Sequence, residues 1–282
     1  MSDLSFEIHF DTDIYNSSSI NLLQKTLLEI SPIFCEKLRV LEFERDSKYI
    51  AIDISNPMSL TEAVKAKGLK RGPTYEKLSA KHPPRTSRRF GSTLVYGKAR
   101  STFLNVDFDE YVPGRKSGDS WLFSNTISGF TSAPRISGIT QIEWVRQLMT
   151  KMSEDPAVLW GAAYHKDEFY EKNSLNATEG MRILGRNMRN HLPGLYWLNI
   201  FGPKYRDFIG DKNFNLLETH CSELVGLSRV IELYENPEDW SIKIASDTCK
   251  SITQKIGEEY FYNKEKPNAK TIAPNFTLPT YS

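Results

Sequence analysis

Pairs of short strand-like segments joined by tight turns recur along this chain of 282 residues. Apolar and polar residues alternate over residues 6–10, which predicts a half-buried strand. The same alternation predicts hairpins that join 39–45 to 48–54 and 93–98 to 102–110. Helical periodicity lies between these pairs, without a strict strand–helix–strand rhythm. The chain is therefore expected to adopt an α+β fold, with a mixed, mostly antiparallel sheet or sheets and helices packed on one side.

The remaining elements follow from helical spacing, capping residues and continuous apolar runs. Thr140 precedes a helix and Glu143 follows three residues later, which is the spacing of a capping box. The last helix is expected to run from Asn236 to Gly257. Its predicted inner face holds Trp240, Ile244, Thr248, Ile252 and Ile256. The other expected helices are 18–38 (disturbed at Pro32), 59–67, 178–191 and 203–209, and the other expected strands are 121–130, 157–165, 194–201, 221–225 and 229–234.

The apolar content indicates whether the chain can form a large domain. Hydrophobic residues make up 39% of the chain and aromatic residues 12%, which is enough for a sizeable core. We expect residues 1–282 to form a single compact α+β unit. The order of strand, helix and hairpin partly returns in the second half, so related sub-halves 1–135 and 136–282 are conceivable, although no sequence repeat supports them. Core packing is the expected role of Trp121, Trp144, Trp160, Trp197 and Trp240, with a ligand pocket beside Trp160 or Trp197 as the alternative.

The net charge of +1 hides a local asymmetry. Residues 65–100 contain 11 basic side chains and the single acid Glu76, and they lie between two acidic regions. Within this segment, 68–91 shows no clean periodicity and is expected to be an irregular basic loop. Its charge could hold phosphate or nucleic acid, with Tyr75 and Phe90 stacking on bases. Alternatively, it is a solvated loop or a contact with another protein.

The search for catalytic and metal-binding motifs gives no catalytic or cofactor signature. The chain contains no phosphate-binding glycine loop, dinucleotide fingerprint or nucleophile elbow. The best metal candidate is His165 with Asp167 and Glu168, but these neighbours supply ligands from one direction, whereas a metal site needs several. A solvated strand end is the alternative. We therefore expect no metal, no cofactor and no enzymatic activity.

Cysteine usage and apolar run lengths indicate the compartment. Cys35, Cys221 and Cys249 form an odd, widely spaced set, which is no disulfide framework and fits a reducing compartment. No run of about 18 apolar residues is present, as a transmembrane helix would require. The first residues lack the basic start and apolar run of a secretory signal. These features predict a cytoplasmic protein with no membrane partner.

An acidic strand end is the one local cluster of carboxylates that stands out. Asp107 and Asp109 are two residues apart, so both carboxylates are expected on one face of a strand. Such a pair could bind metal or act in acid–base chemistry. The alternative is exposed charge at the end of a strand.

Several motifs in residues 139–278 resemble those of a known family. Glu143-Trp144 lies within a helix and Trp160-Gly161 within a strand, and the run LPGLYWLNIFGPKYRDFIG follows at 192–210. LYENPEDW, IGEEYF and APNFTLP come after it. Their order is similar to that of bacterial immunity proteins of type VI secretion and other polymorphic toxin systems, once grouped as a domain of unknown function. G-L-Y-W-L-N-x-F-G-P-x-Y is the most specific part.

The resemblance implies a cytoplasmic protein that is encoded beside a toxin and neutralises it by direct binding. It carries no catalytic residues. A surface that recognises one toxin should lie in charged loops, because the motif residues are mainly apolar. Asp107, Asp109 and Glu110 are therefore the candidate contact residues for a basic toxin, and loop 65–91 for an acidic one. A nucleic-acid-binding or phage-defence protein using 65–100, and an enzyme with an unrecognised site, remain the alternatives.

Overall fold

The computed structural model of the chain describes residues 3–10, 19–32, 39–41, 49–51, 56, 60, 89–96, 102–109, 125–177, 180–183, 191–192, 194–216 and 222–272. The strands of the main sheet are β1 (Leu4–Phe10), β2 (Arg39–Leu41), β3 (Tyr49–Ala51), β4 (Arg89–Tyr96), β5 (Thr102–Asp109), β6 (Asn125–Thr131), β9 (Val158–His165), β12 (Leu198–Phe201), β13 (Ser222–Val225) and β14 (Ser228–Glu232). They form one ten-stranded sheet in the order β13-β14-β12-β9-β1-β6-β5-β4-β2-β3. Every neighbouring pair is antiparallel, so the predicted α+β fold class with antiparallel pairing is confirmed.

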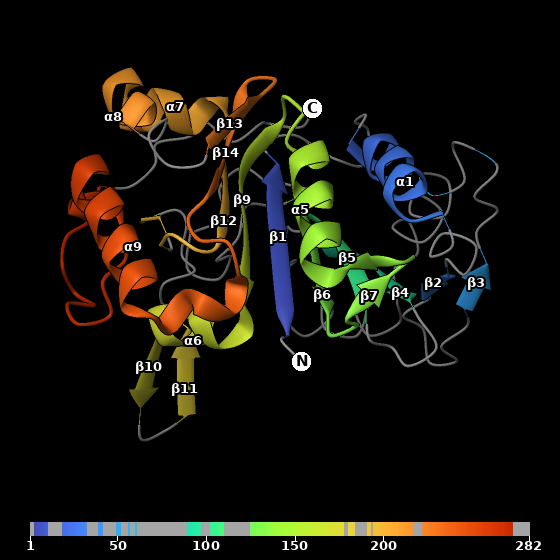
Figure 1. Cartoon of the computed structure of the whole chain (residues 1–282), viewed down its shortest axis with the longest axis horizontal. Helices are drawn as coiled ribbons and strands as arrows, with labels where there is room; N and C mark the ends of the chain where they lie inside the picture. Colours follow the sequence, from blue (N-terminus) through green and yellow to red (C-terminus); the bar gives the residue numbers. More distant parts are fainter. Residues whose placement is uncertain are drawn as a thin grey trace, which may run out of the picture.

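Two further pairs of strands stand apart from this sheet, and helices cover it. The pairs are β7 (Arg135–Ile136) with β8 (Ile139–Thr140), and β10 (Ser174–Ala177) with β11 (Gly180–Ile183). The α-helices are α1 (Ser19–Ile30), α5 (Gln141–Met152), α6 (Lys166–Asn173), α7 (Pro203–Ile209), α8 (Asp211–Leu216) and α9 (Lys243–Ile256). The 3-10 helices are η2 (Pro237–Ser241) and η3 (Glu258–Tyr260). Figure 1 shows β1 and β9 side by side near the centre, with β10 and β11 projecting below α6.

The central strand β1 is more buried than its alternating sequence predicts. It pairs with β6 on one side and with β9 on the other. Its polar residues Glu7 and His9 are almost fully buried, as are its apolar ones. Glu7 Oε2 lies 3.0 Å from His9 Nε2, and the Tyr164 hydroxyl donates to Glu7 Oε1 at 3.0 Å. The predicted strand is confirmed, but its expected half-burial is wrong, because Glu7 and His9 are buried and these polar groups satisfy one another inside the sheet.

Helices pack on both faces of the sheet, which differs from the expected packing on one side. One core cluster joins β1 to α1 and α5 and includes Phe6 and Trp144. A second joins β9 and β14 to α7, α8 and α9 and includes Tyr164 and Ile252. Ala163 belongs to the first cluster, and successive strand residues point to opposite faces, so the two clusters lie on opposite faces. In Figure 1, α5 and α9 accordingly lie on either side of the central strands.

Two expected elements are wrong. Residues 180–183 form β11 and not part of a helix, because they pair with β10 directly after α6. The last helix is divided, since η2 precedes α9 and extended Ile242 separates the two. Because of this break, the residues of α9 that face the core are not those that one continuous helix would bury. Ile244 is consequently 75% exposed and Trp240 half-buried, and the helix buries Ala245, Ile252 and Ile256.

Other boundaries differ for local reasons. Only the second half of 194–201 is a strand, because the Asn199 side chain bonds both the N–H and the C=O of Tyr196 and so replaces ladder bonds there. The expected irregular loop 68–91 ends inside β4, whose first residue is Arg89. Its residues 68–88 lie outside the described residues, as do Trp121 and all of the expected helix 59–67 except Leu60. Trp144, Trp160 and Trp197 are buried, which confirms their predicted core role.

The predicted cap of α5 provides a first test. Thr140 Oγ1 accepts from the Glu143 N–H at 3.2 Å, whereas the Glu143 carboxylate turns to Arg146 and Gln147, so half of the capping box forms. Thr140→Ala should lower the free energy of unfolding by about 1 kcal/mol. Thr140→Ser keeps the hydroxyl and should match the wild type in urea unfolding. Equal stability of all three proteins would mean that the cap contributes nothing.

Candidate functional site

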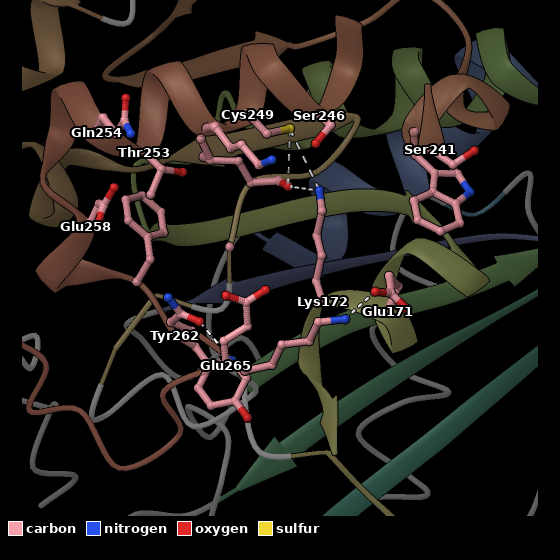
Figure 2. A pocket seen from close by; sticks show the side chains of 17 residues that line it. Glu171, Lys172, Ser241, Ser246, Cys249, Thr253, Gln254, Glu258, Tyr262 and Glu265 are labelled. Atoms are coloured by element: carbon pink, nitrogen blue, oxygen red, sulfur yellow. Dashed lines mark hydrogen bonds and ion pairs between the residues drawn. The ribbon is translucent and has the colours of Figure 1, made fainter. Parts of the chain in front are cut away.

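A hollow of about 680 Å³ lies between α6, α9 and the chain after η3. We call it the α6–α9 trough. Ser246, Cys249 and Thr253 line it from one face of α9 because they recur at helical spacing. Figure 2 shows these side chains along one side of the trough, with Tyr262 and Glu265 across from them. Its volume falls within the range of small-ligand sites, about 300–1,000 Å³.

Lys172 forms the inner wall of the trough. Its Nζ donates to Glu168 Oε1 at 2.6 Å and to the Leu195 carbonyl at 2.5 Å, and it lies 3.8 Å from Cys249 Sγ. An ammonium group has three N–H donors, so each is directed at one of these partners. Figure 2 shows the Lys172 side chain pointing toward Cys249. Lys172 therefore ties α6 to α9 and to the chain before β12.

A buried acid stands behind Lys172. Glu168 is fully buried, and the Tyr234 hydroxyl donates to its Oε1 at 2.5 Å. Burial raises the pKa of Glu168, although the nearby Lys172 ammonium opposes the shift. The pKa of Tyr234 is also raised, first by burial and then by the adjacent Glu168 carboxylate. This arrangement holds the phenol protonated as a hydrogen-bond donor.

Cys249 is not activated as a nucleophile in this arrangement. Burial raises the pKa of its thiol more strongly than Lys172 lowers it. The reactive form of cysteine is the thiolate, which such a shift disfavours. Lys172 has its donors engaged, and Tyr234 is held protonated. The wall is thus suited to fixing the shape of the trough.

The titration of Glu168 gives a prediction for stability against pH. Glu168→Gln imitates the protonated carboxyl, so the stability difference between wild type and this variant isolates one titration. Since burial raises the folded-state pKa of Glu168, the wild type should be most stable relative to Glu168→Gln below the unfolded pKa of about 4.3. Its relative stability should fall as pH rises through the folded pKa. Urea unfolding of both proteins across this range measures the difference, and a difference that stays constant or grows with pH contradicts the assignment.

The rim of the trough carries charges and aromatic rings. Lys264 Nζ forms an ion pair with Glu171, drawn as a dashed line in Figure 2. Glu258 and Glu265 are exposed on the lining, as is Lys250. None of these three has an ion pair within the part of the chain that the structure describes. The half-buried rings of Trp240 and Tyr262 also contribute to the lining.

The predicted contact residues lie elsewhere. Asp107 and Asp109 are on β5, where the register places Asp107 opposite Gly91 and Asp109 opposite Arg89. That both carboxylates share one face of the strand stays a prediction from their spacing. Glu110 lies outside the described residues. Neither aspartate belongs to the lining of the trough, so the structure does not join this pair to the one hollow described above.

The candidate metal ligands do not converge. His165 Nδ1 accepts from the Asp167 N–H at 3.2 Å and so caps α6, while Glu168 turns inward to Lys172 and Tyr234. Among the described residues, no group of three or more His, Cys, Asp or Glu side chains could hold a metal ion. Sequence reasoning missed the role of Lys172, although its i,i+4 spacing from Glu168 was a signal of pairing.

A second polar cluster explains why the motif residues matter to the fold. Arg146 of α5 donates to both oxygens of Glu232, with Nε to Oε2 at 3.0 Å and Nη2 to Oε1 at 2.6 Å. The indole Nε1 of buried Trp197 donates to Glu232 Oε1 at 3.1 Å, and the Arg146 guanidinium lies 5.8 Å from the Trp197 ring centroid. The helix with the Glu143-Trp144 pair is thereby fixed to the G-L-Y-W-L-N run and to β14.

We compared the chain with protein families, curated sequences and solved structures. No protein-family model matches the sequence, and no curated protein matches it. Among solved structures, the chain is similar to a T6SS protein of Pseudomonas aeruginosa, with a TM-score of 0.48 and 12% sequence identity. The similarity covers 89% of this chain and 74% of that chain. None of the helices in the described residues combines the length and apolar composition needed to cross a membrane.

Proposed function

We propose that this chain is an immunity protein, which binds the toxin domain encoded beside it and neutralises that toxin by direct contact. The observation that carries the proposal is the run G-L-Y-W-L-N-x-F-G-P-x-Y at 194–205, the most specific part of the family resemblance. Its large side chains are core residues, namely Leu195, Tyr196, Trp197, Leu198, Phe201 and Tyr205. The run therefore determines the fold, and the recognition surface lies on exposed residues around it.

The chemistry of the α6–α9 trough supports binding without turnover. A catalytic centre needs a group that can transfer a proton to or from the substrate, or attack the substrate as a nucleophile. Lys172 has its N–H donors directed at Glu168, Leu195 and Cys249. The Cys249 thiol has a raised pKa. A preformed hollow whose wall is held by hydrogen bonds and an ion pair supports a role in binding.

A co-expression survival assay tests the proposal. The toxin domain from the neighbouring open reading frame is expressed in a sensitive host with and without this chain. Growth should be restored by the wild type and lost with Gly202→Ala, which is expected to be unable to fold. An unrelated toxin domain serves as the specificity control and should still arrest growth. Growth arrest despite soluble wild-type protein would overturn the immunity role for this pair.

A further inference from the structure

A loop that follows η3 forms the outer wall of the α6–α9 trough. This loop, which we call loop 263–270, contributes Asn263, Lys264 and Glu265 to the lining. Figure 2 shows Glu265, together with Tyr262 before the loop, across the hollow from the side chains of α9. The position of the loop therefore determines how far the trough opens on that side.

Backbone hydrogen bonds fix both ends of the loop to the body of the protein. At the first end, the Tyr262 N–H donates to the Leu192 carbonyl at 2.8 Å. At the second end, the Ile272 N–H donates to the Glu259 carbonyl at 2.8 Å. Phe261, just before the loop, is buried in the core cluster that joins β9 and β14 to α7, α8 and α9. Movement of the loop is therefore confined to the residues between these two anchors.

The loop between the anchors buries none of its side chains. All of its residues are exposed except Lys264, which is half-buried. Short-range bonds hold its own turns, since the Lys266 N–H donates to the Asn263 carbonyl and the Ala269 N–H donates to the Lys266 carbonyl. A segment without buried apolar contacts opens at a low free-energy cost. The loop is thus built to move as a unit about its two anchors.

An ion pair joins this loop to α6. It forms between Lys264 Nζ and the Glu171 carboxylate, and both residues line the trough. The dashed line at Glu171 in Figure 2 marks this pair. The two side chains are 35% and 60% exposed, so water and salt screen their attraction. Such a pair holds weakly, and breaking it frees the loop without disturbing the core.

We propose that loop 263–270 is a flap that opens and closes the α6–α9 trough, with the Lys264–Glu171 ion pair as its latch. In the closed state the loop forms the outer wall, and Cys249 lies half-buried in the lining. In the open state solutes reach Cys249 and the Lys172 ammonium beside it. The flap is independent of the immunity role, because it concerns access to the hollow alone.

Alkylation of Cys249 measures the opening of the flap. The whole chain is treated with iodoacetamide, and peptide mass spectrometry follows Cys249 separately from Cys35 and Cys221. Lys264→Ala breaks the latch and should raise the alkylation rate at Cys249 by about 2- to 5-fold. Loss of a nearby cation by itself disfavours the thiolate and slows alkylation, so a faster rate reports opening and not charge.

Lys266→Ala is the matched control for the loss of charge. Lys266 lies on the same exposed loop, does not line the trough, and has no ion pair within the part of the chain that the structure describes. This variant should alkylate at the wild-type rate. Equal rates at Cys249 for wild type, Lys264→Ala and Lys266→Ala would overturn the flap.

A charge swap and added salt test the latch itself. Glu171→Lys with Lys264→Glu restores an ion pair of reversed polarity and should return the rate to the wild-type value. Sodium chloride at about 1 M should raise the wild-type rate toward that of Lys264→Ala and leave Lys264→Ala unchanged, because salt screens exposed charges. A swapped protein that alkylates as fast as Lys264→Ala, or a wild-type rate that salt does not change, would overturn the latch.

Discussion

Gly202→Ala is expected to lower the free energy of unfolding by more than about 3 kcal/mol and to leave little soluble protein. A Cβ at this position would lie 1.8 Å from the Val158 carbonyl oxygen and 2.9 Å from that of Leu159, and both atoms are backbone. No side-chain rotation can relieve this overlap. The Gly202 N–H also donates to the Leu159 carbonyl at 3.0 Å, so separating the two segments breaks that bond as well.

Gly161→Ala is the matched control for this overlap. Its added Cβ would meet the Glu7 carbonyl oxygen and Ile200 Cδ1, each at 3.1 Å, which a small shift can relieve. It should cost about 1–2 kcal/mol. Soluble yield and urea unfolding of both variants give the comparison. A Gly202→Ala protein as stable as Gly161→Ala would show that β9 and the end of β12 are not packed as described.

Trp197→Ala is expected to cost about 3–5 kcal/mol of unfolding free energy, as for other buried tryptophans. The Trp197 side chain is fully buried in the cluster that joins β1, α1 and α5. Its removal opens a cavity beneath the Arg146–Glu232 pair and takes away the indole donor to Glu232. Chemical denaturation with the tryptophan variant and the wild type measures the loss.

Trp197→Phe separates the two contributions. Phenylalanine keeps most of the packing and loses the N–H donor, so it should cost about 1–2 kcal/mol. If Trp197→Phe is as damaging as Trp197→Ala, the polar contact to Glu232 dominates and the cavity argument is wrong. If both variants match the wild type, the run at 194–205 does not determine the fold in the way described.

Local patterns predicted much of the fold. The hairpins of β2 with β3, β4 with β5, and β13 with β14 are antiparallel pairs of neighbouring segments, so alternation and turn residues predict them. Thr140 and Pro203 marked the starts of α5 and α7 through short-range capping rules. These features depend on residues a few positions apart, and a single sequence displays them directly.

The misses depend on distant contacts. Residues 180–183 are an exception, because they form β11 by pairing with β10, which ends at Ala177, and so belong to a local hairpin. Glu7 and His9 are buried because Tyr164, far along the chain, completes their network. The α6–α9 trough combines Lys172, Tyr262 and Cys249 from separate elements. No spacing rule brings such residues together, so the sequence alone did not indicate this hollow.

The most direct test of the central claim is light scattering on a sizing column of this chain mixed with the purified toxin domain from the neighbouring reading frame. The immunity role predicts a stable one-to-one complex whose mass is the sum of the two chains. It also predicts that the complex persists on dilution below micromolar concentration. Separate elution of two folded proteins would contradict the claim for this pair.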